Sequence, residues 1–174
     1  MDLELERTFL LKYKPEGLEK SKSCEIIDVY FPKKARHRVL RLRSRDGQKF
    51  EMTKKVQVNQ NDLSEQEEHT ILLSREEFDA LSLAEGKEVH KKRYYYELPG
   101  GRTAEIDIFL DKLSGLAVVD FEFRTREEKE KFEAPDFCSA EITPDEELAG
   151  GILAGGEYSR IEKHLEKYKY KKIV

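Results

Sequence analysis

Residues 3–10 read LELERTFL, a stretch in which apolar and polar side chains alternate. A period of two is typical of a β-strand that buries one face, because successive side chains point to opposite sides. The polar face carries Glu4 and Glu6, whose positions lie only about 7 Å apart. These carboxylates repel each other unless a cation lies between them. Two interpretations follow: an edge strand kept soluble by its acids, or half of a divalent-metal site.

The composition limits the class of protein. The 174 residues suffice for a single domain, 1–174, with a sizeable core. Charged residues make up 39% of the chain, well above the typical fraction of about a quarter. The formal net charge is only −4, so the chain lacks the bulk positive field of a polybasic nucleic-acid binder, and no nucleic-acid partner is expected.

Signals for export or membrane insertion are missing from the sequence. It has no apolar run of membrane-spanning length and no signal-peptide segment near its start. Cys24 and Cys138 are too few and too isolated for a disulfide framework or a structural zinc site. We therefore expect a cytoplasmic protein with reduced cysteines and no membrane partner.

Alternating segments recur along the chain and predict about eight strands. Asp46-Gly47 predicts a tight hairpin, and Ser74 with Glu77 forms a capping box that begins a helix carrying Phe78 and Leu81 inward. The strands are expected at 3–10, 25–31, 39–45, 49–58, 67–73, 89–98, 103–110 and 116–124. Helices are expected after Ser74, at 127–132, from Pro144 and at 158–170, with a basic turn at 33–37, a loop at 59–65 and an irregular segment at 135–140.

Paired like charges two residues apart recur on one face of these strands. The bases are Arg41, Arg43, Lys55, Lys91 and Arg93, and the acids are Glu4, Glu6, Glu68, Glu105, Asp107, Asp120 and Glu122. An open sheet with a wet charged face is one interpretation. Like charges at this spacing cost free energy unless a ligand or an opposite strand compensates. The pattern therefore favours an α+β protein built on a closed antiparallel β-barrel, with a charged lumen and helices packed outside.

The charges of this lumen restrict its ligand. Seven acids exceed five bases by two, so a polyanion enters only together with divalent cations. The acids would hold Mg²⁺ or Mn²⁺, and the arginines and lysines would bind phosphoryl oxygens. This combination predicts metal-assisted phosphoryl transfer.

The sequence resembles the triphosphate tunnel metalloenzymes, also called the CYTH superfamily, over nearly the whole chain. Each motif is short, but their order is specific. The motifs are Glu4-Leu5-Glu6, Asp28-Val29-Tyr30-Phe31, Leu40-Arg41-Leu42-Arg43, Thr53-Lys54-Lys55, Lys91-Lys92-Arg93-Tyr94, Glu105-Ile106-Asp107, Asp120-Phe121-Glu122-Phe123, Pro135-Asp136-Phe137 and Glu141-Ile142-Thr143.

The resemblance implies an eight-stranded antiparallel tunnel that hydrolyses inorganic triphosphate or an organic triphosphate with Mg²⁺ or Mn²⁺. The catalytic residues would be Glu4, Glu6, Lys55 and Glu122, and the phosphates would lie against Arg41, Arg43, Lys55, Lys91 and Arg93. The metal ligands would come from Glu4, Glu6, Glu68, Glu105, Asp107, Asp120 and Glu122, with Glu67 in place of Glu68 if the alignment slips by one residue.

One departure from the family leaves alternatives open. The lysine that follows the two family glutamates falls on Thr8 here, and Arg7 has the parity of the outer face. The chain is therefore a triphosphatase, a class IV-type adenylyl cyclase that makes cyclic AMP, or a catalytically weakened module that binds triphosphates or nucleotides. A homodimer is also open. Surface or structural roles are expected for His37, His69, His90 and His164, which lie in separate segments.

Overall fold

A computed structural model describes residues 2–36, 40–59 and 62–174. His37 and Val39, expected in the basic turn and at the start of a strand, lie outside the described residues. No helix among the described residues is long and apolar enough to cross a membrane.

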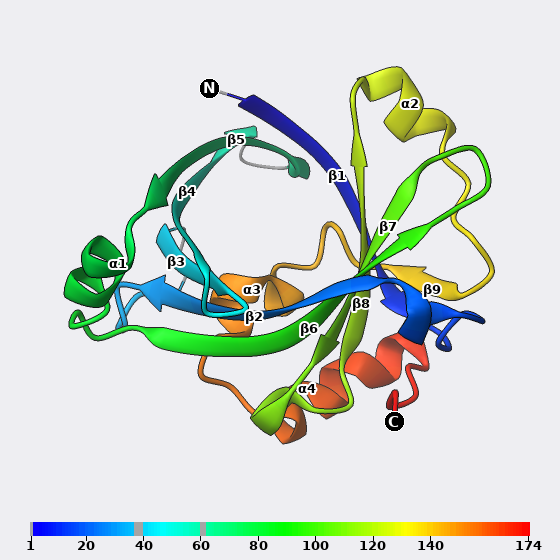
Figure 1. The fold of residues 1–174 in the computed structure, drawn as a ribbon. Helices are drawn as coiled ribbons and strands as arrows, with labels where there is room; N and C mark the ends of the chain where they lie inside the picture. Colours follow the sequence, from blue (N-terminus) through cyan, green and yellow to red (C-terminus); the bar gives the residue numbers. More distant parts are fainter. Residues whose placement is uncertain (1, 37–39, 60–61) are drawn as a thin grey trace.

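Eight antiparallel strands curl around a common axis and close on themselves (Figure 1). Their hydrogen-bonded order is β5-β4-β3-β2-β6-β7-β8-β1, and pairing of β1 with β5 completes the ring. The predicted α+β architecture on a closed barrel is therefore confirmed. The strands are β1 (Asp2–Leu11), β2 (Lys22–Phe31), β3 (Leu40–Arg45), β4 (Lys49–Asn59), β5 (Asp62–Leu73), β6 (Lys87–Glu97), β7 (Thr103–Phe109) and β8 (Ala117–Phe123).

The hairpin between β3 and β4 follows from local chemistry. Asp46 and Gly47 both have positive φ, 50° and 62°. Two left-handed residues in a row match the right-handed twist of the flanking strands, and Asp-Gly is among the pairs that adopt this conformation most readily. The turn therefore sets the register in which Arg43 pairs with Glu51.

The prediction of a loop at 59–65 is wrong for residues 59 and 62–65, which lie in strands, whereas residues 60 and 61 lie outside the described residues. β4 and β5 approach each other until Asn59 pairs with Asp62. The residues there are polar, but β5 pairs with β4 on one side and with β1 on the other, where Leu5 lies opposite Glu65. Hydrogen bonds to two neighbours hold the backbone extended whatever the side chains are.

The irregular segment expected at 135–140 is also partly wrong, because it contains a ninth strand. β9 (Cys138–Glu141) pairs with β1 on the edge opposite β8, beyond the residues that pair with β5, and Leu11 lies opposite Cys138. Four residues carry too little alternation to reveal a strand in the sequence, and only the exposed ladder of β1 makes it one.

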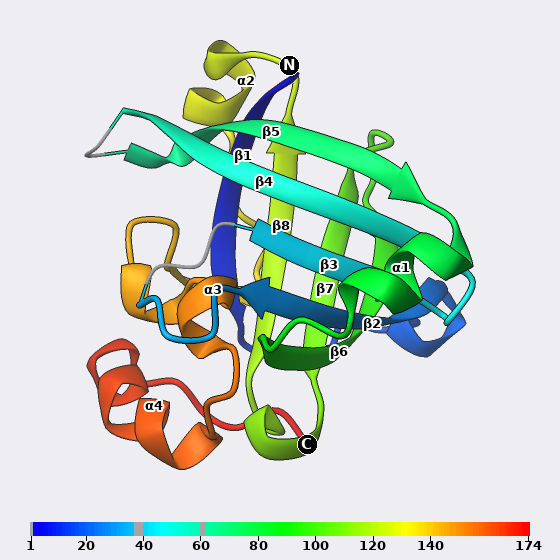
Figure 2. The same ribbon diagram turned by 90° about the vertical axis from the view of Figure 1, so that its left-hand side faces the viewer.

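The helices lie around the outside and at one end of the barrel (Figure 2). α1 (Arg75–Leu81) starts at the predicted capping box, and Phe78 packs on Phe50 with ring centroids 4.6 Å apart. Leu81 is 40% exposed, so the prediction that it points inward is wrong. The helix ends at this residue. The other helices are α2 (Arg126–Lys131), α3 (Gly150–Leu153) and α4 (Tyr158–Leu165), and the 3₁₀ turns are Leu18–Lys20, Asp111–Leu113, Glu146–Leu148 and Glu166–Tyr168.

The helix expected to open at Pro144 begins later. Pro144 lies in a turn, and the short 3₁₀ helix starts at Glu146 with Asp145 as its N-cap. The Asp145 side chain accepts a hydrogen bond from the amide of Glu147. Proline has no side-chain acceptor and could not cap the helix in this way. The helical segment is therefore displaced by about two residues from its expected start.

The inner face of the barrel changes character along its length. Charged residues on four strands are followed, toward one end, by apolar residues that form one cluster with the segment after β9. The cluster includes Leu10, Val89, Phe109 and Val118 from the strands and Leu148, Leu153, Tyr158 and Leu165 from the C-terminal segment. Packing of this segment leaves the charged part of the inner face as the site.

The outer face carries the second part of the core. Leu5, Phe9 and Phe121 are almost fully buried beneath the segment that contains α2. On β4 and β5 the outer face stays open: Val56 is 42% exposed and Ile71 is 52% exposed. α1 and α2 therefore pack outside the barrel, as expected, but cover only part of it, whereas α3 and α4 pack against the apolar end of the inner face.

Candidate active site

All twelve residues expected in the site line one cavity of about 820 Å³. They come from β1 and from β3 to β8, and in each strand they occupy alternate positions. The lining includes Glu4, Glu6, Arg41, Arg43, Lys55, Glu68, Lys91, Arg93, Glu105, Asp107, Asp120 and Glu122. Of the two residues left open on β5, Glu68 lines the cavity and Glu67 does not. The structure brings the residues together but does not test the role of any of them.

The acids gather on three neighbouring strands. Glu6 on β1 lies directly opposite Glu122 on β8, and Asp120 on β8 lies directly opposite Glu105 on β7. Directly opposed like charges destabilise a sheet unless a cation compensates. This side of the cavity is therefore an acidic wall that requires positive charge.

Arg93 supplies part of that charge. Its guanidinium donates to Glu105, to both oxygens of Asp107 at 2.7 and 2.6 Å and to Asp120 at 3.3 Å, and Lys91 also donates to Asp107. Burial alone would raise the pKa of Asp107, but Arg93 and Lys91 hold that pKa well below its usual range. Asp107 therefore stays ionised and fixes both cations.

Lys55 plays the same part between three strands. Its Nζ lies 2.5 Å from Glu4, 3.5 Å from Glu68 and 3.9 Å from Glu6. Burial disfavours the charged ammonium, but the charges of Glu6 and Glu4 outweigh burial and raise the pKa of Lys55. The ammonium is therefore held at the centre of the acids that a metal ion would also bind.

Arg43 and Arg41 meet Asp28 on the opposite wall. Arg43 donates to both oxygens of Asp28 at 2.6 and 2.7 Å, and Asp28 is fully buried. Burial would raise the pKa of Asp28, but Arg43 and then Arg41 hold it well below its usual value. Arg41 lies 3.9 Å from the same carboxylate, and among the described residues its buried Nε has no hydrogen-bond partner. Asp28 therefore holds Arg41 less closely than it holds Arg43.

The remaining acids carry more negative charge than their neighbours neutralise. Burial, together with the charges of Glu6 and Asp107, raises the pKa of Asp120 to about 6. Burial also raises the pKa of Glu6, assisted by Glu4 and Glu122 and opposed by Lys55. Desolvation and like charges both favour the protonated form, so a bound cation would stabilise the ionised carboxylates.

The residues present fit a hard divalent cation in donor type and charge, because carboxylate oxygens are the ligands that Mg²⁺ and Mn²⁺ prefer. The described part of the chain holds no preformed group of three acidic, histidine or cysteine side chains around one metal position. Instead, Lys55 forms an ion pair with Glu4, and Arg93 forms one with Asp120. A metal ion would therefore have to exchange with these ammonium and guanidinium groups.

Thr8 lies on the inner face of β1 and Arg7 on the outer face, as the alternation predicts. The Thr8 hydroxyl donates to Asp120 at 2.8 Å inside the cavity. Arg7 points outward and donates to Glu141 on β9 at 3.0 and 2.6 Å. Arg7 therefore does not replace the cation that is missing at Thr8.

Several lining residues were missed in the sequence. Arg45 and Glu51 lie 3.2 Å apart at the far end of β3 and β4 and line the same cavity. Continuing the alternation of Arg41 and Arg43 by one step would have found Arg45. Asp28 lies in one of the family motifs, but its part in the site depends on Arg43, fifteen residues away in sequence, which the alternation does not reveal.

The described histidines stay away from the site. His90 lies between Glu25 and Asp111 at 3.0 and 2.7 Å, and His164 lies 2.7 Å from Asp145. Neither these two nor His69 lines the cavity. The prediction of surface or structural roles is consistent with this placement.

Comparison with known proteins agrees with this geometry. The family model described as CYTH domain matches residues 2–140. An inorganic triphosphatase from Nitrosomonas europaea is 32% identical over 152 residues, which cover 87% of this chain and 96% of that protein. A crystal structure of an inorganic triphosphatase is 28% identical, covers 90% of this chain and 97% of its own, and has a TM-score of 0.63. A crystal structure described as that of a hypothetical protein is 29% identical, covers 88% and 99%, and also has a TM-score of 0.63.

Proposed function

We propose, because the chain belongs to the CYTH domain family, that it hydrolyses a triphosphate compound with the help of Mg²⁺ or Mn²⁺. Inorganic triphosphate is the simplest substrate, and it is the compound named for the relative from Nitrosomonas europaea. The proposal needs one cavity that binds both a polyanion and cations.

The observation that carries the proposal is the division of charge inside the cavity. Glu6, Glu122 and Asp120 lie together on β1 and β8, where like charges oppose each other. Arg41 and Arg43 lie on β3, and the Nε of Arg41 has no hydrogen-bond partner among the described residues. A triphosphate with its metal ions is a ligand that satisfies both walls at once.

The cations of the cavity would bind the phosphates. Arg41, whose buried Nε has no hydrogen-bond partner among the described residues, would be the first contact, and Arg43 is held beside it by Asp28. Lys91 and Arg93 lie against Asp107, and Lys55 lies against Glu4. These groups already face the cavity, so binding changes their partner from carboxylate to phosphoryl oxygen and needs little movement.

The acids would hold the divalent ions through Glu4, Glu6, Asp120 and Glu122, supported by Glu68, Glu105 and Asp107. When bound, such ions neutralise phosphate charge and lower the pKa of a coordinated water. Glu4, Glu6, Lys55 and Glu122 would orient the attacking water and balance the charge that develops as pyrophosphate leaves the terminal phosphorus. Each of these roles is part of the proposal.

The test is phosphate release from inorganic triphosphate with Mg²⁺ or Mn²⁺. The unaltered protein is expected to release phosphate, and EDTA is expected to stop the release. Arg41→Met is expected to raise the KM by about tenfold, because a charge-assisted hydrogen bond to phosphate is lost. Glu6→Gln is expected to lower kcat by at least about tenfold. Glu127→Gln, on the exposed surface of α2, is the matched control.

The same assay with ATP separates the rival activities. Cyclic AMP and pyrophosphate as products would establish an adenylyl cyclase, whereas phosphate and ADP or pyrophosphate and AMP would establish hydrolysis. Thr8 in the cavity is the observation that favours a binding module. Tight binding of inorganic triphosphate without turnover by the unaltered protein would select that reading over both enzymes.

A further inference from the structure

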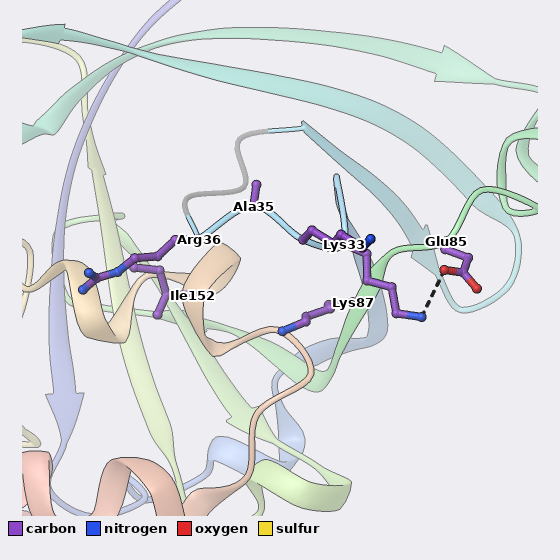
Figure 3. A pocket seen from close by; sticks show the side chains of 7 residues that line it. Lys33, Ala35, Arg36, Glu85, Lys87 and Ile152 are labelled. Carbon is purple, nitrogen blue, oxygen red and sulfur yellow. Dashed lines mark hydrogen bonds and ion pairs between the residues drawn. The ribbon is translucent and has the colours of Figure 1, made fainter.

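A second hollow adjoins the cavity where β2 leads toward β3 (Figure 3). Its volume is about 640 Å³. It is lined by Lys33, Lys34, Ala35, Arg36, Glu85, Lys87 and Ile152, and we call it the basic pocket. Four of these described lining residues are bases and one is an acid. Ile152 on α3 lines both this pocket and the cavity, so the two spaces meet at that side chain.

Lys87 lies in the same cross-strand row as a cation of the cavity. Tyr30 on β2 pairs with Arg41 on β3 and with Lys87 on β6. Residues directly opposite each other share a face of the sheet, so Arg41 and Lys87 share one face. Neighbouring strands lie about 4.8 Å apart, which separates the two Cα atoms by about 10 Å. One extended ligand can therefore contact both residues.

The basic pocket holds positive charge that the neighbouring acids leave unneutralised. Lys33 pairs with Glu85 at 3.2 Å and Arg36 pairs with Glu147 at 2.5 Å. Among the described residues, no ion pair is formed by Lys34 or Lys87. These two ammonium groups are therefore available to an anion.

Local packing fixes Lys87. Its aliphatic stem lies against Gly155, where an added Cβ would come within 3.0 Å of Cδ. The amide of Gly155 donates to the carbonyl of Glu88 at 2.8 Å, which holds the two segments together. Gly155 has a φ of 71°, so glycine suits this position in both conformation and space. Packing against Gly155 thus restricts where the ammonium group of Lys87 can lie.

The chemistry of the lining indicates which anion fits. Among the described residues that line it, Ala35 and Ile152 are the only apolar ones and none is aromatic. Recognition of nucleobases relies on stacking against aromatic side chains. Lysine ammonium groups bind phosphate as point charges, without demanding one orientation. The basic pocket therefore suits a flexible chain of phosphates better than a nucleoside.

We propose that the basic pocket is an outer phosphate-binding site, which takes the phosphates beyond the third of a linear polyphosphate whose end lies in the cavity. The inference rests on the proposed function in one respect, since it requires the cavity to hold a triphosphate group. It extends the substrate class from inorganic triphosphate to longer polyphosphates.

The test compares Lys34→Gln, Lys87→Gln and the double variant with Lys20→Gln. Lys20 is exposed and follows Glu19, which accepts a hydrogen bond from Tyr94 toward the other end of β6. This control therefore removes one positive charge far from the basic pocket. With Mg²⁺ or Mn²⁺, the double variant is expected to raise the KM for long-chain polyphosphate by about fivefold, the effect of two exposed phosphate contacts. The KM for inorganic triphosphate is expected to stay unchanged, and Lys34→Arg is expected to retain the affinity for the long chain.

Calorimetric titration of long-chain polyphosphate in EDTA gives a second readout that does not depend on turnover. The double variant is expected to bind about fivefold more weakly than the unaltered protein at low salt, with a smaller difference at high salt. If neither substrate is hydrolysed, the proposed function fails while this titration still decides the basic pocket. Lys34→Gln lies in an exposed loop and serves if Lys87→Gln disturbs folding.

Three results would overturn the inference. The first is equal KM changes for both substrates, which would place the two lysines in the triphosphate site itself. The second is a loss in Lys20→Gln as large as that in the double variant, which would indicate general charge attraction. The third is a larger loss for an RNA with a 5′-triphosphate than for polyphosphate, which would assign the basic pocket to nucleic acid.

Discussion

Thr8 is the single residue whose identity most changes the charge of the cavity. It occupies the inner face of β1 opposite Asp120 and donates a neutral hydroxyl to that carboxylate. A lysine at this position would bring an ammonium group beside Asp120 and Glu6, the two acids whose pKa values are raised. This ammonium group would then neutralise part of the negative charge of the acidic wall.

We expect Thr8→Lys to bind inorganic triphosphate more tightly in the absence of divalent metal, by about tenfold, because one charge-assisted contact is gained. Calorimetric titration in EDTA measures the change. Thr8→Met, which fills similar space without charge, is the control. If Thr8→Lys and Thr8→Met bind alike, the charge at this position is not what limits phosphate affinity.

Asp28 is the acid on which the phosphate side of the cavity is built. It is fully buried and accepts two hydrogen bonds from Arg43. Asp28→Asn leaves the buried guanidinium without a counter-charge, and breaking such a pair costs about 3–5 kcal/mol of unfolding free energy. Urea denaturation at pH 7 measures this loss.

Glu127→Gln is the matched control for Asp28→Asn. It breaks the Glu127–Lys131 pair, in which both side chains are 75% exposed. Exposed pairs contribute little to stability because water screens them. Equal losses for the two variants would mean that Arg43 finds another partner when Asp28 is neutralised.

At the scale of elements, Asp145 joins the turn after β9 to the C-terminal helix. Its carboxylate accepts hydrogen bonds from His164 and Tyr168, both at 2.7 Å, and lies 2.8 Å from Lys167. Burial would raise the pKa of Asp145, but the hydrogen bonds from Lys167, Tyr168 and His164 outweigh it and lower the pKa to about 2. This contact holds α4 and the following turn near the apolar end of the barrel.

The depressed pKa fixes the sign of a pH effect. The unfolded carboxyl titrates near its ordinary value of 3.8, so the ionised form stabilises the fold fully above about pH 4, and the contribution disappears as the pH falls toward 2. Asp145→Asn is expected to lose about 2 kcal/mol of unfolding free energy at pH 5 and less at pH 3. Urea denaturation at both values measures it, and an equal loss at both would contradict the assignment.

At the scale of the whole molecule, closure of the barrel concentrates unbalanced charge on the inside. Glu6 and Glu122 oppose each other because β1 pairs with β8, and Lys55 reaches Glu4 and Glu68 because β1 and β4 both flank β5. The folded state therefore contains repulsion that a ligand can relieve. Binding to the folded chain alone stabilises it by mass action.

We expect Mg²⁺ or Mn²⁺ to raise the Tm. At about 100 times the Kd the gain is about 2.7 kcal/mol, which corresponds to roughly 5–10 °C for a chain of this size. Differential scanning calorimetry measures the shift, and EDTA is expected to reverse it. Glu122→Gln is expected to reduce it, since it removes one carboxylate from the acidic wall. A shift reproduced by a monovalent salt of equal ionic strength would point to screening instead of binding.

Local sequence determined most of the strands, because alternation and turn chemistry act over a few residues. The Asp46-Gly47 turn, the Ser74 cap and the inward parity of Glu4, Arg41 and Lys55 all follow from such neighbours. The closed barrel and the shared cavity were predictable for the same reason, since paired like charges on strand after strand need a common compensating partner.

The tertiary structure alone decided which charged side chains form ion pairs and which polar or short segments become strands. The extension of β5, the short strand β9 and the pairing of Asp28 with Arg43 depend on neighbours supplied by other parts of the chain. The raised pKa of Asp120 and the looser pairing of Arg41 with Asp28 depend on distances that alternation does not encode. The sequence by itself determined which side chains face inward, because parity is local; only the closed fold decided their partners, because electrostatic interaction depends on separation in space.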